Sequence, residues 1–138
     1  GVCPKDAVLP ASDESNDILN CKIAEYTKAV IDGRPNFHIS LVIDVSPYCD
    51  CHAENDAAIV PNVGMFASFD PVALDLACAE AVNKQPVIKN SLLGDKMETE
   101  PHHDHFHTVS PETNWESSIE HGVKIGIGQK EYELIQVK

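Results

Sequence analysis

The chain has 138 residues, of which 43% are hydrophobic and 23% charged, and its 22 acidic against 10 basic side chains give a formal net charge of -12. This length and composition are typical of one soluble globular domain with a real core. The acidic balance excludes nucleic acid and anionic membrane surfaces as partners, because both would repel the chain. No apolar run approaches the roughly 18 residues that a membrane-spanning helix needs.

The cysteine count points to a reducing compartment. Five cysteines, an odd number, do not suit a complete disulfide framework. The first residues, 1–5, show no charged leader followed by an apolar block. We therefore expect a cytoplasmic protein whose thiols bind metal or stay free.

Residues 1–5 contain Cys3 followed by Pro4, as at the end of a bacterial ferredoxin motif. The three upstream cysteines of such a motif are absent. Two interpretations stay open at this point, a remnant of an iron–sulfur module and a chance match.

A first helix is predicted over residues 12–32. Ser12 can cap its N-terminus, and Gly33 with Pro35 ends it. Apolar residues at spacings of three and four predict one stripe that faces a core. The stripe consists of Leu19, Ile23, Tyr26 and Val30.

Residues 37–45 are β-branched and apolar almost throughout, which predicts a central strand buried on both faces and covered by a helix. A second short extended segment is predicted over residues 57–67. Asp70 and Pro71 then provide the N-cap and the first-turn proline of a second helix that ends near Asn83.

Residues 86–111 show no clear period and predict a long irregular loop, of a kind that tends to be functional. The loop carries four histidines within residues 102–107. In an extended segment His103, His105 and His107 would face one side, a spacing that can chelate a divalent metal. The alternative is a solvated polar loop.

The chain closes with a predicted helix that starts at residue 113 and ends near residue 122 or 125, and with a strand over residues 132–137. Trp115 is expected to be an anchor in the core or at an interface. The expected fold class is therefore α/β, a small mixed sheet flanked by helices. We expect it to be a fragment of a larger domain.

Residues 47–52, Pro-Tyr-Cys-Asp-Cys-His, follow the predicted central strand and carry the clearest chemical signal. Cys49 and Cys51 are soft donors and histidines are borderline donors, so together they suit zinc or iron better than magnesium or calcium. One or two further ligands would complete a structural or a catalytic site. The candidates for these are His52, His103 and His105.

Two other interpretations of Cys49 and Cys51 stay open. A disulfide between cysteines one residue apart closes a small, strained ring that is easily reduced, which would make the pair a redox couple. Alternatively, both residues are unliganded thiols.

Five segments of the chain, in the same order, resemble the DUF362 family. The segments are Asn36–His38, Cys49–Cys51, Ile59–Asp75, His103–Phe106 and Ile125–Leu134. The Cys-Asp-Cys and Asp-Pro-Val-Ala-x-Asp pieces are specific together. The family consists of proteins of unassigned function, many of which carry a ferredoxin-like insert and are described as binding iron–sulfur clusters.

The resemblance implies that residues 1–11 are the remnant of such an insert and that residues 12–138 are a C-terminal α/β domain. Cys3 would be the last cluster ligand. One cysteine cannot hold a four-iron cluster, so we expect a 4Fe–4S cluster in the full-length protein only. Asn62 and Gln129 stand where the family pattern predicts an aspartate and a serine or threonine, which weakens any role assigned to them.

We therefore expect a metal-binding C-terminal domain of a ferredoxin-linked iron–sulfur redox protein. Zinc or iron would bind at Cys49 and Cys51, with histidine ligands from the candidates above. The expected partner is a redox protein or the ferredoxin-like part of the same protein, and a homo-oligomer stays open.

Two hypotheses of other classes remain. In one, the chain belongs to an enzyme whose cleft is shared with a missing N-terminal half, and His38, Asp70 and a cysteine act as acid, base or nucleophile. In the other, the chain is a scaffold that docks the ferredoxin insert to a partner.

Overall fold

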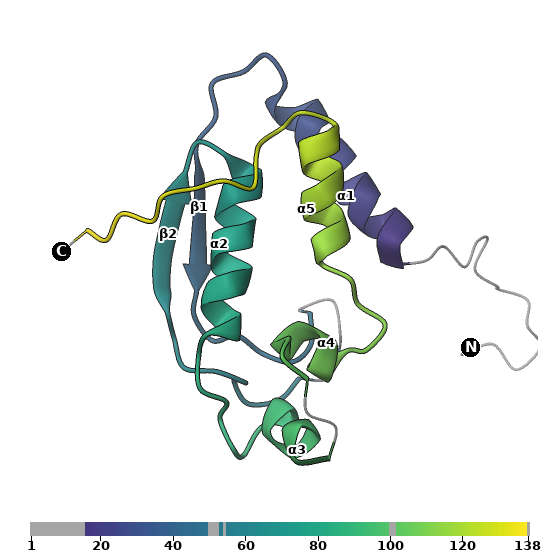
Figure 1. Cartoon of the computed structure of the whole chain (residues 1–138), viewed down its shortest axis with the longest axis vertical. Coiled ribbons are helices and arrows are strands. Elements are labelled where there is room, and N and C mark those ends of the chain that lie inside the picture. The colour runs from purple at the N-terminus through teal and green to yellow at the C-terminus, as the bar shows by residue number, and fades with distance from the viewer. Residues whose placement is uncertain (1–15, 50–52, 54, 100–101, 138) are drawn as a thin grey trace, which may run out of the picture.

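The computed structural model of the chain describes residues 16–49, 53, 55–99 and 102–137 (Figure 1). These residues form a two-stranded sheet with helix α2 lying along it, a pair of long helices, α1 and α5, and two short helices at the opposite end. The elements in chain order are α1 (Asn16–Ile31), β1 (His38–Val42), β2 (Gly64–Ser68), α2 (Pro71–Asn83), α3 (Leu92–Thr99), α4 (His105–Val109) and α5 (Glu116–Lys124). The predicted α/β class is confirmed.

Strands β1 and β2 pair antiparallel, from His38 opposite Ser68 to Val42 opposite Gly64. The described part of the chain therefore holds an antiparallel pair where a mixed sheet was predicted. Helix α2 packs against both strands and covers one face of the sheet. The side chains of β1 that point toward α2 therefore lie between the sheet and this helix.

The prediction that β1 is buried on both faces is wrong for the described structure. Val42 is buried against α2, but Ile39 and Leu41, which point the other way, are each more than half exposed. The second face is exposed because α2 covers only the first and no described segment covers the other.

Helix α1 is confirmed, although its described part begins at Asn16. Gly33 follows its C-terminus with a φ of 68°, the left-handed conformation that glycine tolerates best. The predicted buried stripe is wrong. Helix α1 packs against α5 and buries Ala24. The stripe residues Leu19, Ile23, Tyr26 and Val30 are each more than half exposed.

Helix α2 begins as predicted. Asp70 has an extended backbone, and its Oδ1 accepts a 2.9 Å hydrogen bond from the N–H of Ala73. Pro71 occupies the first helical position, where its missing N–H costs nothing.

One apolar cluster joins β1, α2, α3 and α4. Val60 and Leu93 are completely buried at its centre. The other buried members are Val42, Ile59, Val82 and Val109.

The prediction of an irregular loop over residues 86–111 is wrong, because this stretch contains α3 and α4. Ser91 Oγ accepts a hydrogen bond from Gly94 N in the first turn of α3, and Asp104 caps α4. Both helices add apolar residues to the core, which stabilises them.

The last predicted helix is confirmed as α5. The predicted closing strand is not formed: residues 131–137 are exposed and have neither helical nor strand structure. No described strand lies beside them to complete a ladder, although the segment runs across α2 in Figure 1. None of the helices described has the length and apolar composition to span a membrane.

Candidate functional site

A hollow of about 460 Å³ lies between the N-terminus of α1, the start of α4 and the segment that leads into α5. Three imidazoles line it, from His102, His103 and His107. Carboxylates of Asp17, Asp104, Glu112 and Glu116 also line it. The hollow thus combines borderline nitrogen donors with an acidic wall.

The imidazole of His102 contacts the other two. The His102 ring stacks on His103 with centroids 4.2 Å apart, and its centroid lies 4.6 Å from that of His107. Nδ1 of His102 accepts a 3.1 Å hydrogen bond from the N–H of Asp104, so a neutral His102 ring carries its proton on Nε2. Within the described residues, the rings of His103 and His107 make no hydrogen bond. These two rings therefore have nitrogen lone pairs available for a ligand.

Asp104 builds this arrangement. Its Oδ1 accepts from the N–H groups of Phe106 and His107, at 2.9 and 3.4 Å, and so starts α4. Burial raises the pKa of Asp104. The combined lowering effect of its hydrogen bonds is larger, so the pKa lies below its usual value. The donors of these bonds are Trp115, Phe106, His107 and Asn83. Asp104 is therefore an ionised cap at the wall of the hollow.

His105 does not line the hollow. His105 and His107 are two residues apart in α4 and therefore lie on different faces of the helix, so the one-sided arrangement predicted for an extended loop does not form. His105 is 6% exposed, and Nε2 of its ring lies 3.1 Å from the carbonyl oxygen of Gln85. The backbone N–H of His105 donates a hydrogen bond to Oδ1 of Asn83. Nδ1 is buried with no hydrogen-bond partner among the described residues.

The residues that flank the cysteine segment pack in the same apolar cluster as α4. Cys51 and His52 lie outside the described residues, as does Cys3, and Cys49 is exposed. Val45 precedes the segment and Ile59 follows it, and both belong to the apolar cluster that contains Val109 of α4. Val45 and Ile59 therefore both belong to the core against which α4 packs.

Ser46 links the two sides of this segment. Its hydroxyl donates to the carbonyl oxygen of Tyr48 at 3.1 Å and accepts from Nδ2 of Asn55, also at 3.1 Å. In the described part of the chain, no three His, Cys, Asp or Glu side chains are grouped to hold a metal ion. The predicted metal ligands therefore remain predictions.

A second polar group lies between β1 and α2. His38 and Ser40 point from β1 toward α2, where Asp75 and Cys78 occupy neighbouring turns of one face. Desolvation raises the pKa of Asp75, partly offset by the charge of His38. Burial also raises the pKa of the Cys78 thiol, with a smaller opposing effect from the hydrogen bond to Ser40.

The partners that the sequence predicted for His38 were Asp70 and an unspecified cysteine, whereas the structure brings Asp75 and Cys78 to the side of β1 that carries His38. Asp70 is occupied as a cap, and its Oδ2 accepts a 2.9 Å hydrogen bond from the N–H of Gln129. The spacing of Asp75 and Cys78 on α2, together with the alternation of His38 and Ser40 on β1, was the available signal.

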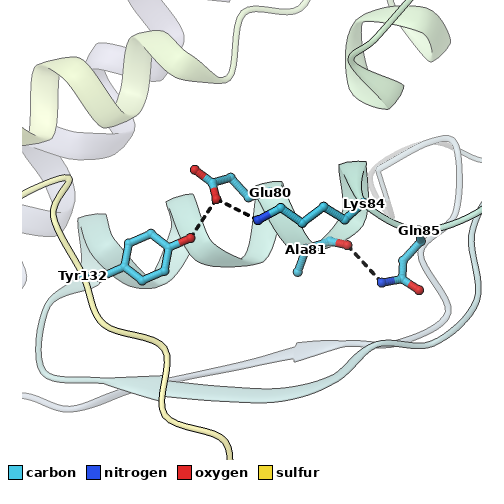
Figure 2. A network of polar contacts seen from close by, with 5 residues as sticks. All are labelled: Glu80, Ala81, Lys84, Gln85 and Tyr132. Atoms are coloured by element: carbon cyan, nitrogen blue, oxygen red, sulfur yellow. Dashed lines mark hydrogen bonds and ion pairs between the residues drawn. The ribbon is translucent and has the colours of Figure 1, made fainter.

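Two contacts fix the chain beyond α5 to α2. The first is the Asp70–Gln129 bond, beside which Gly128 approaches so closely that a Cβ would collide with the Asp70 carboxylate. The second joins Tyr132 to Glu80, whose Oε2 accepts from the tyrosine hydroxyl at 2.8 Å (Figure 2). Because Gln129 uses its backbone, its departure from the family pattern does not affect the first contact.

Asn62 also has a defined role. Its Oδ1 accepts a 2.7 Å hydrogen bond from the N–H of Asp44. Asp44 has a φ of 48°, a conformation that few residues other than glycine, asparagine and aspartate adopt readily. An aspartate at position 62 would offer the same acceptor, so the departure from the family pattern preserves this contact.

The sequence matches the family described as "Domain of unknown function (DUF362)" over residues 1–80, which is more than half of the chain. No curated protein and no solved structure matches the chain. The match covers the cysteine segment and most of α2, and it confirms the expected resemblance. The chain belongs to the DUF362 family.

Proposed function

We propose that the cysteine segment and the histidine-lined hollow form one binding site for zinc or iron in a ferredoxin-linked protein. The observation that carries this proposal is the packing of the His102 ring against His103 and His107 in an acidic hollow at the start of α4. The residues that flank the cysteine segment, Val45 and Ile59, share an apolar cluster with Val109 of the same helix.

The donor set suits a borderline to soft ion. Thiolates from Cys49 and Cys51 with imidazole nitrogens from His103 and His107 would give a four-coordinate site of the kind that zinc prefers. The surrounding carboxylates raise the local concentration of cations and favour metal over anionic ligands. His52 is an alternative to one of the two hollow histidines.

Two other histidines of this region fit less well. His102 would have to give up its bond from the Asp104 N–H before Nε2 could bind a metal. His105 is buried and held by Asn83 and Gln85, so it acts as a support for α4 rather than as a ligand.

The site must assemble when the ion binds. The described residues hold no preformed group of three ligands, so the thiolates of the cysteine segment have to close onto the hollow. Such coupling is common where metal binding contributes part of the folding free energy. In the full-length protein a 4Fe–4S cluster with Cys3 as one ligand would supply electron transfer.

Metal analysis of untagged protein tests this proposal. After equilibration with Zn²⁺, or anaerobically with Fe²⁺, and removal of free metal, we expect one ion per chain. Cys49→Ser and Cys51→Ser should abolish stoichiometric binding. His103→Gln and His107→Gln should weaken it by about 10- to 100-fold or more, because loss of a direct ligand costs at least as much as loss of a residue that supports one.

The matched controls are His121→Gln and Cys21→Ser. His121 lies on α5, where its ring contacts Glu25 at 3.0 Å, and Cys21 lies on α1. Both variants should bind metal as the unaltered chain does. Absence of stoichiometric metal, or full retention of it in Cys49→Ser, would contradict the proposal.

A second candidate function is acid–base catalysis at Asp75 and His38. A carboxyl with a raised pKa beside an imidazole is a pattern found at catalytic sites. The raised pKa of Cys78 argues against a thiolate nucleophile at this position.

Carbon-13 NMR titration of the Asp75 carboxyl tests this arrangement. We expect a pKa above 3.8, and a further rise in His38→Gln, because the His38 charge lowers the value. A pKa at or below 3.8 in the unaltered chain, or no change in the variant, would remove the basis for this candidate.

A further inference from the structure

The sheet face that points away from α2 consists of large apolar side chains. They are between 44% and 78% exposed. Leu41 lies opposite Met65 in the ladder, and the rings of Phe37 and Phe69 are 5.0 Å apart, so the residues form one continuous patch. The patch, called the outer face below, consists of Phe37, Ile39, Leu41, Ile43, Met65 and Phe69.

The outer face is more apolar than the face that α2 covers. Toward α2 the two strands present His38, Ser40 and Ser68 along with Val42 and Phe66. In a layered α/β fold the apolar face of a sheet is the one that becomes buried. A two-stranded sheet is also marginal by itself and needs packing on its apolar side.

The edge of β1 is not protected against association either. Natural edge strands avoid association by means of lysine, proline or a β-bulge. Strand β1, His38–Val42, contains no such residue and pairs with β2 in regular register. Nothing in this strand opposes the approach of another polypeptide.

The size and charge of the outer face fit a second copy of the chain. At roughly 100 Å² for each large apolar side chain, the face offers about 600 Å², close to the roughly 800 Å² that each partner buries in a standard interface. No Asp, Glu, Lys or Arg occurs in residues 37–43 or 64–69, and His38 lies on the face that α2 covers. A twofold contact needs only one self-complementary patch, and homodimer interfaces are more apolar than other interfaces.

We propose that the chain forms a homodimer in which the outer faces of two sheets pack together. Each copy carries a net charge of -12, so the apolar contact works against long-range repulsion. Salt screens that repulsion, and association must therefore strengthen as the salt concentration rises. A contact with a basic partner would show the opposite dependence.

Sedimentation velocity of the full chain tests the proposal, from 1 to 200 µM protein in 0.05, 0.15 and 0.5 M NaCl with a chelator present. The chelator separates this test from the metal proposal. We expect a species of twice the chain mass of 15.1 kDa, with a dissociation constant that falls as salt rises. Leu41→Lys and Met65→Lys should each raise that constant by about tenfold or more, because a lysine buried in an apolar interface has no partner.

The matched control is Ile23→Lys. Ile23 on α1 is 53% exposed and Leu41 is 63% exposed, so both substitutions place a charge on an open apolar surface. Ile23→Lys should leave the dimer intact, and circular dichroism should show that all three variants are folded. A monomer at 200 µM in 0.5 M NaCl would overturn the proposal. A dimer that persists in Leu41→Lys, or dissociates in Ile23→Lys, would overturn it as well.

Discussion

The indole Nε1 of Trp115 donates a 2.7 Å hydrogen bond to Oδ2 of Asp104. The other oxygen of the same carboxylate caps α4, so one side chain joins the segment before α5 to the helix that carries His107. The rings of Trp115 and Phe106 also pack with centroids 6.1 Å apart. The shape of the histidine hollow depends on this pair.

Replacing Trp115 by phenylalanine should lower the free energy of unfolding at pH 7 by about 1–2 kcal/mol, because a hydrogen bond to a charged group is lost. Urea denaturation followed by circular dichroism measures this change. Tyr26→Phe, at an exposed position of α1, is the control and should be neutral.

The same variant should change the acid stability. The folded-state pKa of Asp104 lies below 3.8, so its contribution to stability is present above that value and is lost as pH falls through the lower folded pKa. Without the indole donor the shift shrinks, and Trp115→Phe should lose less stability between pH 5 and about pH 2 than the unaltered chain does. Equal losses would contradict this role of Trp115.

Asp70 should be sensitive to two different substitutions. In Asp70→Asn the side-chain oxygen can still cap α2, but the NH2 group cannot accept the hydrogen bond from the Gln129 N–H. Asp70→Ala loses both contacts. Asp70→Ala should therefore cost about 1 kcal/mol more than Asp70→Asn, the usual value of an N-cap. Both variants should exchange the Gln129 amide hydrogen faster, and slow exchange in Asp70→Asn would show that the contact is unimportant.

Asp75→Asn should stabilise the chain at pH 7. Desolvation raises the folded-state pKa of Asp75. The contribution of this carboxyl to stability is therefore fully present below pH 3.8 and is lost as the pH rises through the higher folded-state pKa. Asparagine removes this penalty, and the gain should be less than about 1 kcal/mol because Asp75 is exposed at the surface of α2. Denaturation curves at pH 3 and pH 7 measure the effect, and a destabilised variant at pH 7 would contradict it.

Leu93→Ala should cost about 2–5 kcal/mol, because Leu93 is completely buried at the centre of the core. Leu134→Ala removes the same atoms from a residue that is 65% exposed and should change the stability by less than about 0.5 kcal/mol. Urea denaturation of both variants compares them directly.

The elements that the sequence predicted best have local signals. Asp70 and Pro71 start α2, and Gly33 ends α1, because caps and turns depend on neighbouring residues only. Asp104 is a comparable signal for α4, but the adjacent histidines suggested an extended chelating loop. The cap of Asp104 and the alternating histidines favour different local structures, and the structure follows the cap.

Tertiary features were harder to predict. Apolar spacing identifies a face that tends to be buried, but it does not identify what covers that face. Leu41 on β1 and Ile23 on α1 are exposed for this reason. The approach of His38 to Asp75 depends on how α2 lies across β1, which no local pattern specifies. The cysteine segment stays a predicted site; its flanking residues Val45 and Ile59 pack in the same apolar cluster as Val109 of α4.

X-ray absorption at the metal edge of zinc-loaded protein tests the central claim most directly. The proposed site of Cys49, Cys51, His103 and His107 predicts two sulfur neighbours at about 2.3 Å and two nitrogen neighbours at about 2.0–2.1 Å. His103→Gln should lose a nitrogen neighbour, and Cys49→Ser should lose a sulfur neighbour. A spectrum with oxygen and nitrogen neighbours alone would show that the thiols and the histidine hollow do not share an ion.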